Sequence, residues 1–241
     1  MWIAAVMEKR FLMFYYYFDP TYILVIIGLV ISMLASANVN GSFRKYSRVL
    51  SRRGIRAEQA AQMLLRNAGI TDVAVQRVQG NLTDHYDPRS KTLRLSDSVY
   101  GSTSVSAIGV AAHECGHAMQ HANGYAPLQL RGALVPVVNI ASTISMPLIL
   151  IGLFLGYAGL AQVGAWMFAA VLVFQLVTLP VEFNASSRAL RVLDSAGILY
   201  NEEVGAARNV LRAAALTYVA SALATALQLF RLILLTNRRR D

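Results

Sequence analysis

The sequence predicts a mostly α-helical membrane protein that carries one small α+β segment. Composition is the first observation behind this fold class: 56% of the 241 residues are hydrophobic and 15% are charged, which is too apolar for an ordinary soluble domain. The second is that the apolar residues gather in long uncharged runs. The third is a polar stretch, residues 38 to 131, in which helical and strand-like patterns follow one another.

Three uncharged runs are long enough to cross a bilayer. The first covers residues 21 to 37 and the last covers residues 213 to 230. Between Arg131 and Glu182 lie fifty uncharged residues, enough for two spans of about twenty residues each with a turn between them. We therefore expect a transmembrane hairpin with helices at about 133 to 155 and 162 to 181.

A cleaved signal peptide is the alternative explanation for the first run, because Ala35-Ser36-Ala37 resembles a signal-peptidase site. Two features speak against it. About twenty residues, which include Glu8 and Asp19, precede the run, where a signal peptide has a short basic region. Six basic residues within the next twenty positions would also resist translocation across the membrane. The sequence therefore favours a retained N-terminal anchor.

Basic residues give the chain a net charge of +9, and their location indicates their role. Six lie between residues 44 and 56, just after the first apolar run, and Arg238 to Arg240 end the chain. Basic residues at such places orient membrane proteins and contact anionic lipid headgroups. No basic motif interleaved with aromatic residues accompanies them. We therefore expect a lipid bilayer, and no nucleic acid, as a partner. Cys115 is the single cysteine, which excludes an internal disulfide.

The polar stretch predicts a small α+β segment. Residues 57 to 68 have the apolar spacing of a short amphipathic helix, which Gly69 ends. Strands are expected from residue 73 to 78 and from residue 92 to 96, separated by a turn. Residues 104 to 122 contain no proline and keep helical spacing of their apolar positions, so we expect a second helix there.

Three of the four histidines fall within nine positions of this second helix, in the stretch AAHECGHAMQH. His113 and His117 are four residues apart, so their imidazoles project from one helical face at a spacing that suits one tetrahedral metal ion. Glu114 points about 100° aside, where it can contact a water molecule without being a ligand. Chance would give an HExxH pattern about 0.002 times in a chain of this composition. We interpret the motif as a zinc site rather than as a structural pair of histidines.

A catalytic zinc needs a third protein ligand, for which the sequence offers several residues. His121 lies two helical turns from His113, about 12 Å along the axis, too far for both to reach one ion. Metzincins have a third histidine six residues after the second, but Asn123 stands there. His85 remains open. Glu182 is the stronger candidate because it ends the long uncharged stretch, and ionisable residues at membrane depth are usually functional. The alternative is a glutamate that caps the next helix.

The motif from His113 to His117, together with the Glu-Phe-x-Ala-Ser segment that starts at Glu182, resembles the bacterial membrane zinc metallopeptidases of the YugP type, a neutral zinc metallopeptidase family. The resemblance covers most of the chain from about residue 40 onward. It extends through residues 80–101, 121–136 and 215–223. It implies a gluzincin-like peptidase in which His113, His117 and Glu182 bind Zn²⁺.

More distantly, the chain resembles the HtpX and CAAX-processing peptidases, in which a transmembrane hairpin also separates HExxH from the glutamate ligand. Those relatives carry an aspartate four residues after that glutamate, where this chain has Ser186. We therefore expect a mostly α membrane protein whose transmembrane helices carry a small α+β, zincin-like catalytic segment built around the HExxH helix.

These residues predict an integral membrane zinc-dependent endopeptidase that acts on a protein or peptide substrate. Glu114 would be the general base that takes a proton from the attacking water and then protonates the leaving amine. Tyr218, His85 and Arg188 are candidates for a second oxyanion donor. The strand within residues 91 to 96 would offer a free edge to an extended substrate.

The alternative is a membrane scaffold or metal-handling protein whose zinc is structural or transported. Structural zinc sites are usually closed by four cysteine or histidine ligands, whereas this chain has one cysteine. A transporter should carry ionisable groups inside its spans, and the fifty-residue stretch has none. Both facts favour the enzyme.

Charge placement predicts a multi-pass protein whose active site faces the cytoplasm, and the resemblance implies that the membrane is the bacterial cell (inner) membrane. Twelve of the twenty-two basic residues lie between Asn38 and Arg131, which places this segment inside and the N-terminus outside. The hairpin then returns Glu182 to the side of the two histidines. A fourth full span would place the basic tail outside, against the rule. The last apolar helix therefore either crosses despite its tail, or does not cross and instead packs on the bundle or lies at the interface.

The chain is thereby divided into five segments. They are an N-terminal transmembrane anchor (1–40), a cytoplasmic α+β segment with the active-site helix (41–131), a transmembrane hairpin (132–181), a third-ligand helix segment (182–212) and a C-terminal apolar helix with a basic tail (213–241).

Overall fold

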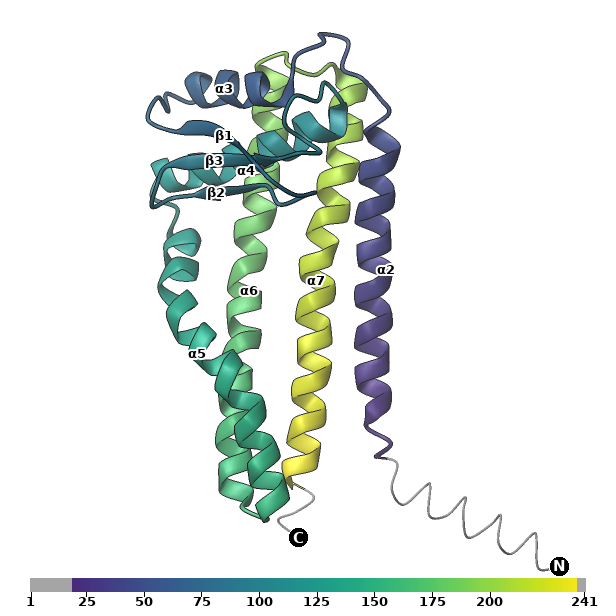
Figure 1. Ribbon diagram of the computed structural model, residues 1–241, viewed down its shortest axis with the longest axis vertical. Coiled ribbons are helices and arrows are strands. Elements are labelled where there is room, and N and C mark those ends of the chain that lie inside the picture. The colour runs from purple at the N-terminus through teal and green to yellow at the C-terminus, as the bar shows by residue number, and fades with distance from the viewer. Residues whose placement is uncertain (1–18, 238–241) are drawn as a thin grey trace, which may run out of the picture.

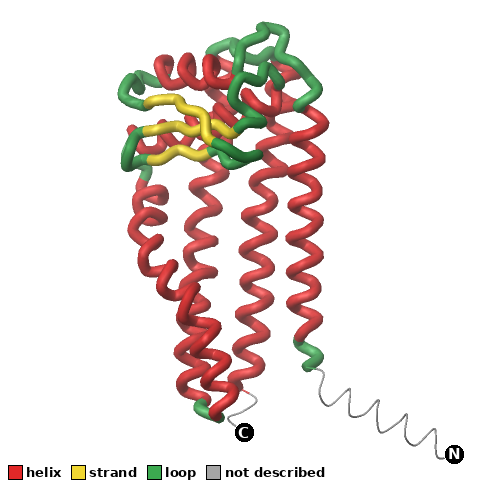
Figure 2. Tube along the Cα trace, viewed as in Figure 1, coloured by secondary structure: helices red, strands yellow, loops and turns green. Residues whose placement is uncertain are grey.

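The computed structural model describes residues 19 to 237. Four long helices form a bundle, and a three-stranded sheet with two shorter helices covers one end of it (Figure 1, Figure 2). This confirms the predicted fold class. The expectations for residues 1–18 and for the tail Arg238 to Arg240 lie outside the described residues. The elements are α2 (Tyr22–Tyr46), α3 (Ala57–Asn67), β1 (Ala74–Val78), β2 (His85–Asp87), β3 (Thr92–Ser96), α4 (Val105–Ala122), α5 (Ala126–Leu155), α6 (Ala158–Ser195) and α7 (Asn201–Asn237).

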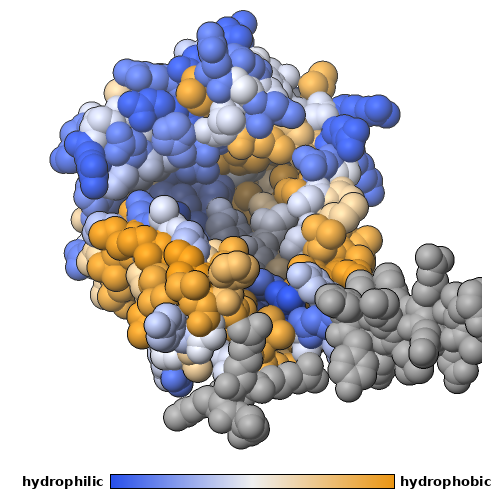
Figure 3. All heavy atoms as spheres, turned by 60° about the horizontal axis from the view of Figure 1, so that its bottom comes forward, coloured by the Kyte–Doolittle hydropathy of each residue, from blue (hydrophilic) through white to orange (hydrophobic). Residues whose placement is uncertain are grey.

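The helices α2, α5, α6 and α7 are each long and apolar enough to cross a membrane. Large apolar side chains cover their outer surfaces: Leu34 is 65% exposed, Trp166 71% and Phe154 90%. In Figure 3 hydrophobic residues gather over the bundle, whereas hydrophilic residues cover the end that carries the sheet. In water this surface would be a large exposed apolar patch, so lipid is the solvent that suits it.

The second helix of the hairpin is longer than the apolar run that predicted it. α6 continues without a break to Ser195, past residue 181, where the membrane span is expected to end. Glu182 does not end the helix because Ala185 and Ala189 keep the helical spacing and are buried against the rest of the protein. The division of the chain into five segments stays a prediction.

The helix α7 lies within the bundle beside α2, an arrangement that does not match a helix lying flat at the membrane interface. It runs unbroken past residue 212, where a segment boundary was expected. Near its lower end the Arg231 guanidinium lies 3.1 Å from a carboxylate oxygen of Asp19. Higher up, a Cβ on Gly28 of α2 would lie 3.1 Å from Ala224 of α7, so this glycine lets the two helices approach closely.

The sheet has the strand order β1-β3-β2. β3 pairs in parallel with β1 and antiparallel with β2. The expectation that residues 91 to 96 form a free edge is therefore wrong, since β3 is the central strand. The alternation of the sequence shows that Leu93 and Leu95 are buried, but not which strands lie beside them. The edge strand that contacts α4 is β2.

The helix α4 lies between the sheet segment and the bundle. Its apolar face packs on α3 and the sheet, where Leu64, Leu95 and Ile108 are fully buried. Its opposite face meets α6 at Gly116, where a Cβ would overlap the backbone carbonyl of Ala185. A residue without a side chain is therefore required at this crossing.

We expect Gly116→Ala to force α4 and α6 apart, because the added methyl group collides with a backbone carbonyl rather than with a flexible side chain. Overpacking of this kind costs about 1 to 3 kcal/mol. The variant should therefore melt at a lower temperature and retain less zinc after purification. Gly205→Ala is the matched control, since a Cβ there meets nothing within 4 Å. Equal melting temperatures of the two variants would contradict the tight crossing.

Candidate metal centre

The helix α4 carries the HExxH motif, as its spacing predicts. Ser104 begins the helix: its hydroxyl accepts a hydrogen bond from the Ala107 N–H at 3.3 Å. Eighteen helical residues follow, and their small apolar side chains bury α4 on several sides. The His113 and His117 rings lie one turn apart with their centroids separated by 4.8 Å. Both rings face α6 across the crossing at Gly116.

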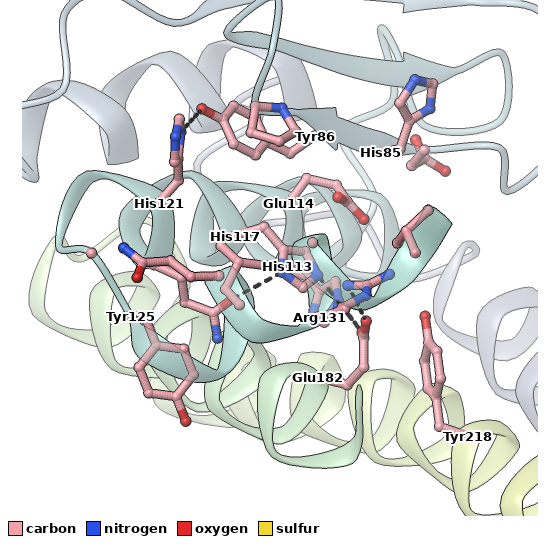
Figure 4. A pocket seen from close by; sticks show the side chains of 18 residues that line it. His85, Tyr86, His113, Glu114, His117, His121, Tyr125, Arg131, Glu182 and Tyr218 are labelled. Atoms are coloured by element: carbon pink, nitrogen blue, oxygen red, sulfur yellow. Dashed lines mark hydrogen bonds and ion pairs between the residues drawn. The ribbon is translucent and has the colours of Figure 1, made fainter. Parts of the chain in front are cut away.

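Glu182 of α6 points toward both rings (Figure 4). Its Oε2 lies 3.3 Å from His113 Nε2 and 3.6 Å from His117 Nε2. The candidate ligand atoms of the three residues all lie within 4.8 Å of one another. Two ligands bound at about 2.05 Å from a tetrahedral zinc lie about 3.3 Å apart. The two separations between Glu182 and the histidines lie near this value, so these three residues are a candidate ligand set for a zinc ion.

Gln120 determines which nitrogen of the neutral His117 ring carries the proton. Its amide nitrogen donates to the Val181 carbonyl at 2.8 Å and to Asn184 Oδ1 at 3.0 Å. The amide oxygen therefore accepts a hydrogen bond from His117 Nδ1–H, 3.0 Å away. With the proton on Nδ1, the Nε2 lone pair faces Glu182 and is available to a metal. The sequence analysis missed Gln120, although its place three residues after His117, on the same helical face, was a usable signal.

Ser186 holds the His113 ring in the same way. Its Oγ lies 3.1 Å from His113 Nδ1. The HtpX and CAAX-processing peptidases have an aspartate at this position, one turn after the glutamate. In this chain a shorter and neutral side chain still reaches the ring, so the Nε2 atom of His113 is again directed at Glu182.

Arg131 completes the surroundings of Glu182. Its Nη1 lies 3.2 Å from Glu182 Oε1, the oxygen that does not face the histidines. The Glu182 side chain is 3% exposed, so each of its oxygens has a cationic or imidazole neighbour in place of water. The sequence analysis used Arg131 only as the boundary of the uncharged stretch. The two charged residues end the same hairpin, and antiparallel helices bring the two ends of a hairpin together.

The electrostatic field at this site favours a cation. Burial lowers the pKa of His117, but a hydrogen bond that the ring donates to the Glu182 carboxylate and the charges of Glu114 and Glu182 outweigh it and raise that pKa overall. The carboxylates thus draw positive charge toward the imidazoles, and either a proton or a metal ion can supply it.

A cavity of about 530 Å³ opens beside the histidines, bounded by α4, β2, α5 and α7. Glu114 lines this cavity and is 8% exposed. Asp84 lines it from the loop before β2. Burial raises the pKa of Asp84, and the nearby Glu114 carboxylate adds to this rise against the hydrogen bonds from Ser96. The site therefore combines three candidate metal ligands with the carboxylate of Glu114, which is not one of them.

The two remaining histidines line the cavity but lie outside the metal-binding cluster. His121 Nδ1 is 2.9 Å from the Tyr86 hydroxyl, which agrees with its exclusion on helical geometry. His85, which the sequence left open, donates from Nδ1–H to the Thr83 carbonyl at 2.9 Å. Its Nε2 accepts from Arg94 at 3.3 Å. Both imidazoles therefore already form hydrogen bonds within or next to the sheet, His121 with Tyr86 and His85 with Thr83 and Arg94.

The candidate oxyanion donors separate into two groups. Tyr218 of α7 and His85 line the cavity, and in Figure 4 the Tyr218 side chain stands beside Glu182. Arg188 instead donates to Asn184 Oδ1 at 2.7 Å and is not among the cavity-lining residues.

Together the fold and the site define a helical membrane protein with an HExxH helix, in which a buried glutamate from a membrane-spanning helix joins the two histidines. The model of the family described as "Putative neutral zinc metallopeptidase" matches residues 21–237. The chain belongs to this family.

A curated relative supports the same assignment. The chain is 45% identical over 218 residues to the "Putative membrane protease YugP" of Bacillus subtilis (strain 168). This match covers 90% of the chain and 97% of the relative. The resemblance found in the motifs is thus confirmed. No solved structure matches the chain.

We expect Ser186→Ala to weaken zinc binding by about 10- to 100-fold, because the His113 ring loses the contact that orients it. Competition with a chelator of known affinity measures the change. Ser186→Asp, which supplies the side chain of the distant relatives, should recover most of the affinity. Ser187→Ala is the matched control, because Ser187 is the exposed neighbour. An equal loss in Ser187→Ala would show that the ring contact is not the cause.

Proposed function

We propose that this zinc metallopeptidase family member is an integral membrane endopeptidase whose Zn²⁺ is held by His113, His117 and Glu182. The observation that carries the proposal is the convergence of these side chains, from two helices, beside Glu114 in a cavity of about 530 Å³. Three protein ligands leave one coordination position for a water molecule, as catalytic rather than structural zinc sites do.

Zinc, when bound, supplies a Lewis acid that lowers the pKa of water and polarises the scissile carbonyl. Glu114 accepts the proton of the attacking water and passes it to the leaving amine. Its low exposure keeps its carboxylate in the cavity and reduces competition from bulk water. Gln120 and Ser186 keep both imidazole Nε2 atoms directed inward, and Arg131 balances the charge of Glu182.

Tyr218 is the donor that we assign to the developing oxyanion. Its hydroxyl comes from α7, on the side of Glu182 that faces the cavity. A preorganised O–H donor at such a position stabilises the negative charge of a tetrahedral intermediate. His85 is less suited, because its Nδ1–H already donates to Thr83.

The substrate would add to β2 as an extended strand. β2 is one of the two edge strands of the sheet, and its residues His85 and Tyr86 line the cavity. Backbone hydrogen bonds to an edge bind extended peptides with little dependence on their sequence. On the other side of the cavity lie Leu128 and Val135 of α5, so the peptide runs between a polar edge and an apolar helix. This favours peptide segments close to the membrane surface.

A non-catalytic scaffold or metal-handling protein remains the second candidate. It gives no role to Glu114 or to the open cavity beside the metal-binding residues. The enzyme uses both.

We expect Glu114→Gln to keep its zinc and abolish peptide hydrolysis, because the ligands remain and the proton acceptor does not. Glu182→Ala should lose zinc as well as activity. His121→Ala is the control and should retain zinc, since its ring contacts Tyr86 instead. Metal analysis and a fluorogenic peptide assay on purified protein measure both properties. Undiminished hydrolysis by Glu114→Gln would exclude the proposed mechanism.

We further propose that the site faces the cytoplasm of a bacterial cell. A cysteine at Ser90, an exposed turn residue of the sheet segment, should then react with an impermeant maleimide only after spheroplasts are permeabilised. A cysteine at Tyr157, 67% exposed in the α5–α6 turn at the other end, should react in intact spheroplasts. Burial raises the pKa of Cys115 and removes it from solvent, so the native background is unreactive. The reverse labelling pattern would place the site outside.

A further inference from the structure

A second cavity of about 620 Å³ lies between α6 and α7 and shares no lining residue with the cavity beside the histidines. It is lined by three arginines, Arg191 of α6 and Arg208 and Arg212 of α7, and by the apolar side chains Phe183 and Leu216. We propose that this cleft binds one anionic phospholipid, with its phosphate at the arginines and its acyl chains along the apolar residues.

Charge is the first argument. Asp194 is the one acidic residue that lines the cleft, against three arginines. Within residues 19 to 237, none of these three guanidinium groups has a hydrogen bond or an ion pair to a protein group, whereas Arg52, Arg131 and Arg231 each contact a carboxylate. Clustered arginines without protein acceptors attract a ligand that brings several anionic oxygens, and a phosphate group is such a ligand.

Depth in the membrane is the second argument. Arg212 directly precedes the uncharged run of α7, and Phe183 directly follows Glu182 at the end of the uncharged stretch. The arginines therefore lie at the level of the lipid headgroups. Phe183 and Leu216, 49% and 51% exposed, lie at or below the boundary of the hydrocarbon layer. Arg208 and Leu216 are about 12 Å apart along the helix axis, a distance that a phospholipid spans from its phosphate into its acyl chains.

The position of the cleft in the fold is the third argument. Basic pockets between membrane-spanning helices bind anionic lipid headgroups, and this pocket is formed by two such helices. A soluble anion would use the arginines but would leave the apolar part of the cleft open to solvent. A phospholipid covers both parts, so the mixed character of the cleft favours it.

Native mass spectrometry of the full-length protein in detergent tests the proposal, with phosphatidylglycerol and phosphatidylcholine as probes. The wild type should bind one phosphatidylglycerol in preference to phosphatidylcholine. Each interfacial arginine contributes about a factor of five in affinity, so Arg208→Gln/Arg212→Gln should reduce this preference by about twenty-five-fold. Arg208→Lys/Arg212→Lys should keep much of it, because the charge is retained.

Arg66→Gln/Arg89→Gln is the matched control: it removes the same charge from exposed positions of the sheet segment. This variant should bind phosphatidylglycerol as the wild type does, and the helical circular dichroism of all variants should agree. An equal loss in the control would overturn the proposal, because net charge alone would then explain binding. Displacement of the lipid by millimolar inorganic phosphate would also overturn it, since the cleft would then be an anion site without selectivity for lipid.

Discussion

An ionised carboxylate buried at the edge of a bilayer costs several kcal/mol unless cations or hydrogen-bond donors surround it. Glu182 is such a group, since its side chain is 3% exposed on a helix that is otherwise uncharged over its membrane part. Two imidazoles face one of its oxygens and a guanidinium faces the other. Three helices must therefore meet at this carboxylate, and their arrangement follows from this requirement.

Each of the three contacts fixes one part of the fold. The contact with Arg131 joins the two ends of the uncharged stretch, so it sets the register of α5 against α6. The contacts with the histidines require α4 to lie directly on α6, which Gly116 permits by leaving room for the Ala185 carbonyl. Gln120 adds one hydrogen bond from α4 to the backbone of α6, at Val181, and one to the Asn184 side chain. All these contacts surround the one charge of Glu182. The metal-binding residues therefore come together only if α4 crosses α6 closely, and their contacts in turn hold the two helices at that crossing.

Sequence patterns predicted two kinds of site residue: those whose spacing along one helix is enough to bring them together, and those whose charge is rare in their surroundings. The HExxH spacing defines a helical face by itself, and a lone carboxylate after fifty uncharged residues is conspicuous. Arg131 was missed because a charge at the start of an apolar run is the usual membrane boundary, and only the closed hairpin gives it a partner. The central place of β3 was missed because alternation encodes which face is buried and carries no information on strand order. That α6 passes through Glu182 as one continuous helix was not predicted, because hydropathy marks the end of a membrane span and not the end of the helix that forms it.

The helix α6 separates two environments that a protease at a membrane surface must keep apart. One side of it carries Glu182 in a cavity with polar residues, where peptide hydrolysis requires water. The next residue, Phe183, lines the cleft between α6 and α7, which lipid would fill. Ser186 lies between the two: its hydroxyl contacts His113, and its side chain lines the lipid-facing cleft. A small neutral residue suits both neighbours, because a carboxylate at this position would compete with the phosphate of a bound anionic lipid for the arginines of the cleft. Serine at this position therefore contacts the imidazole and leaves those arginines available to a phosphate.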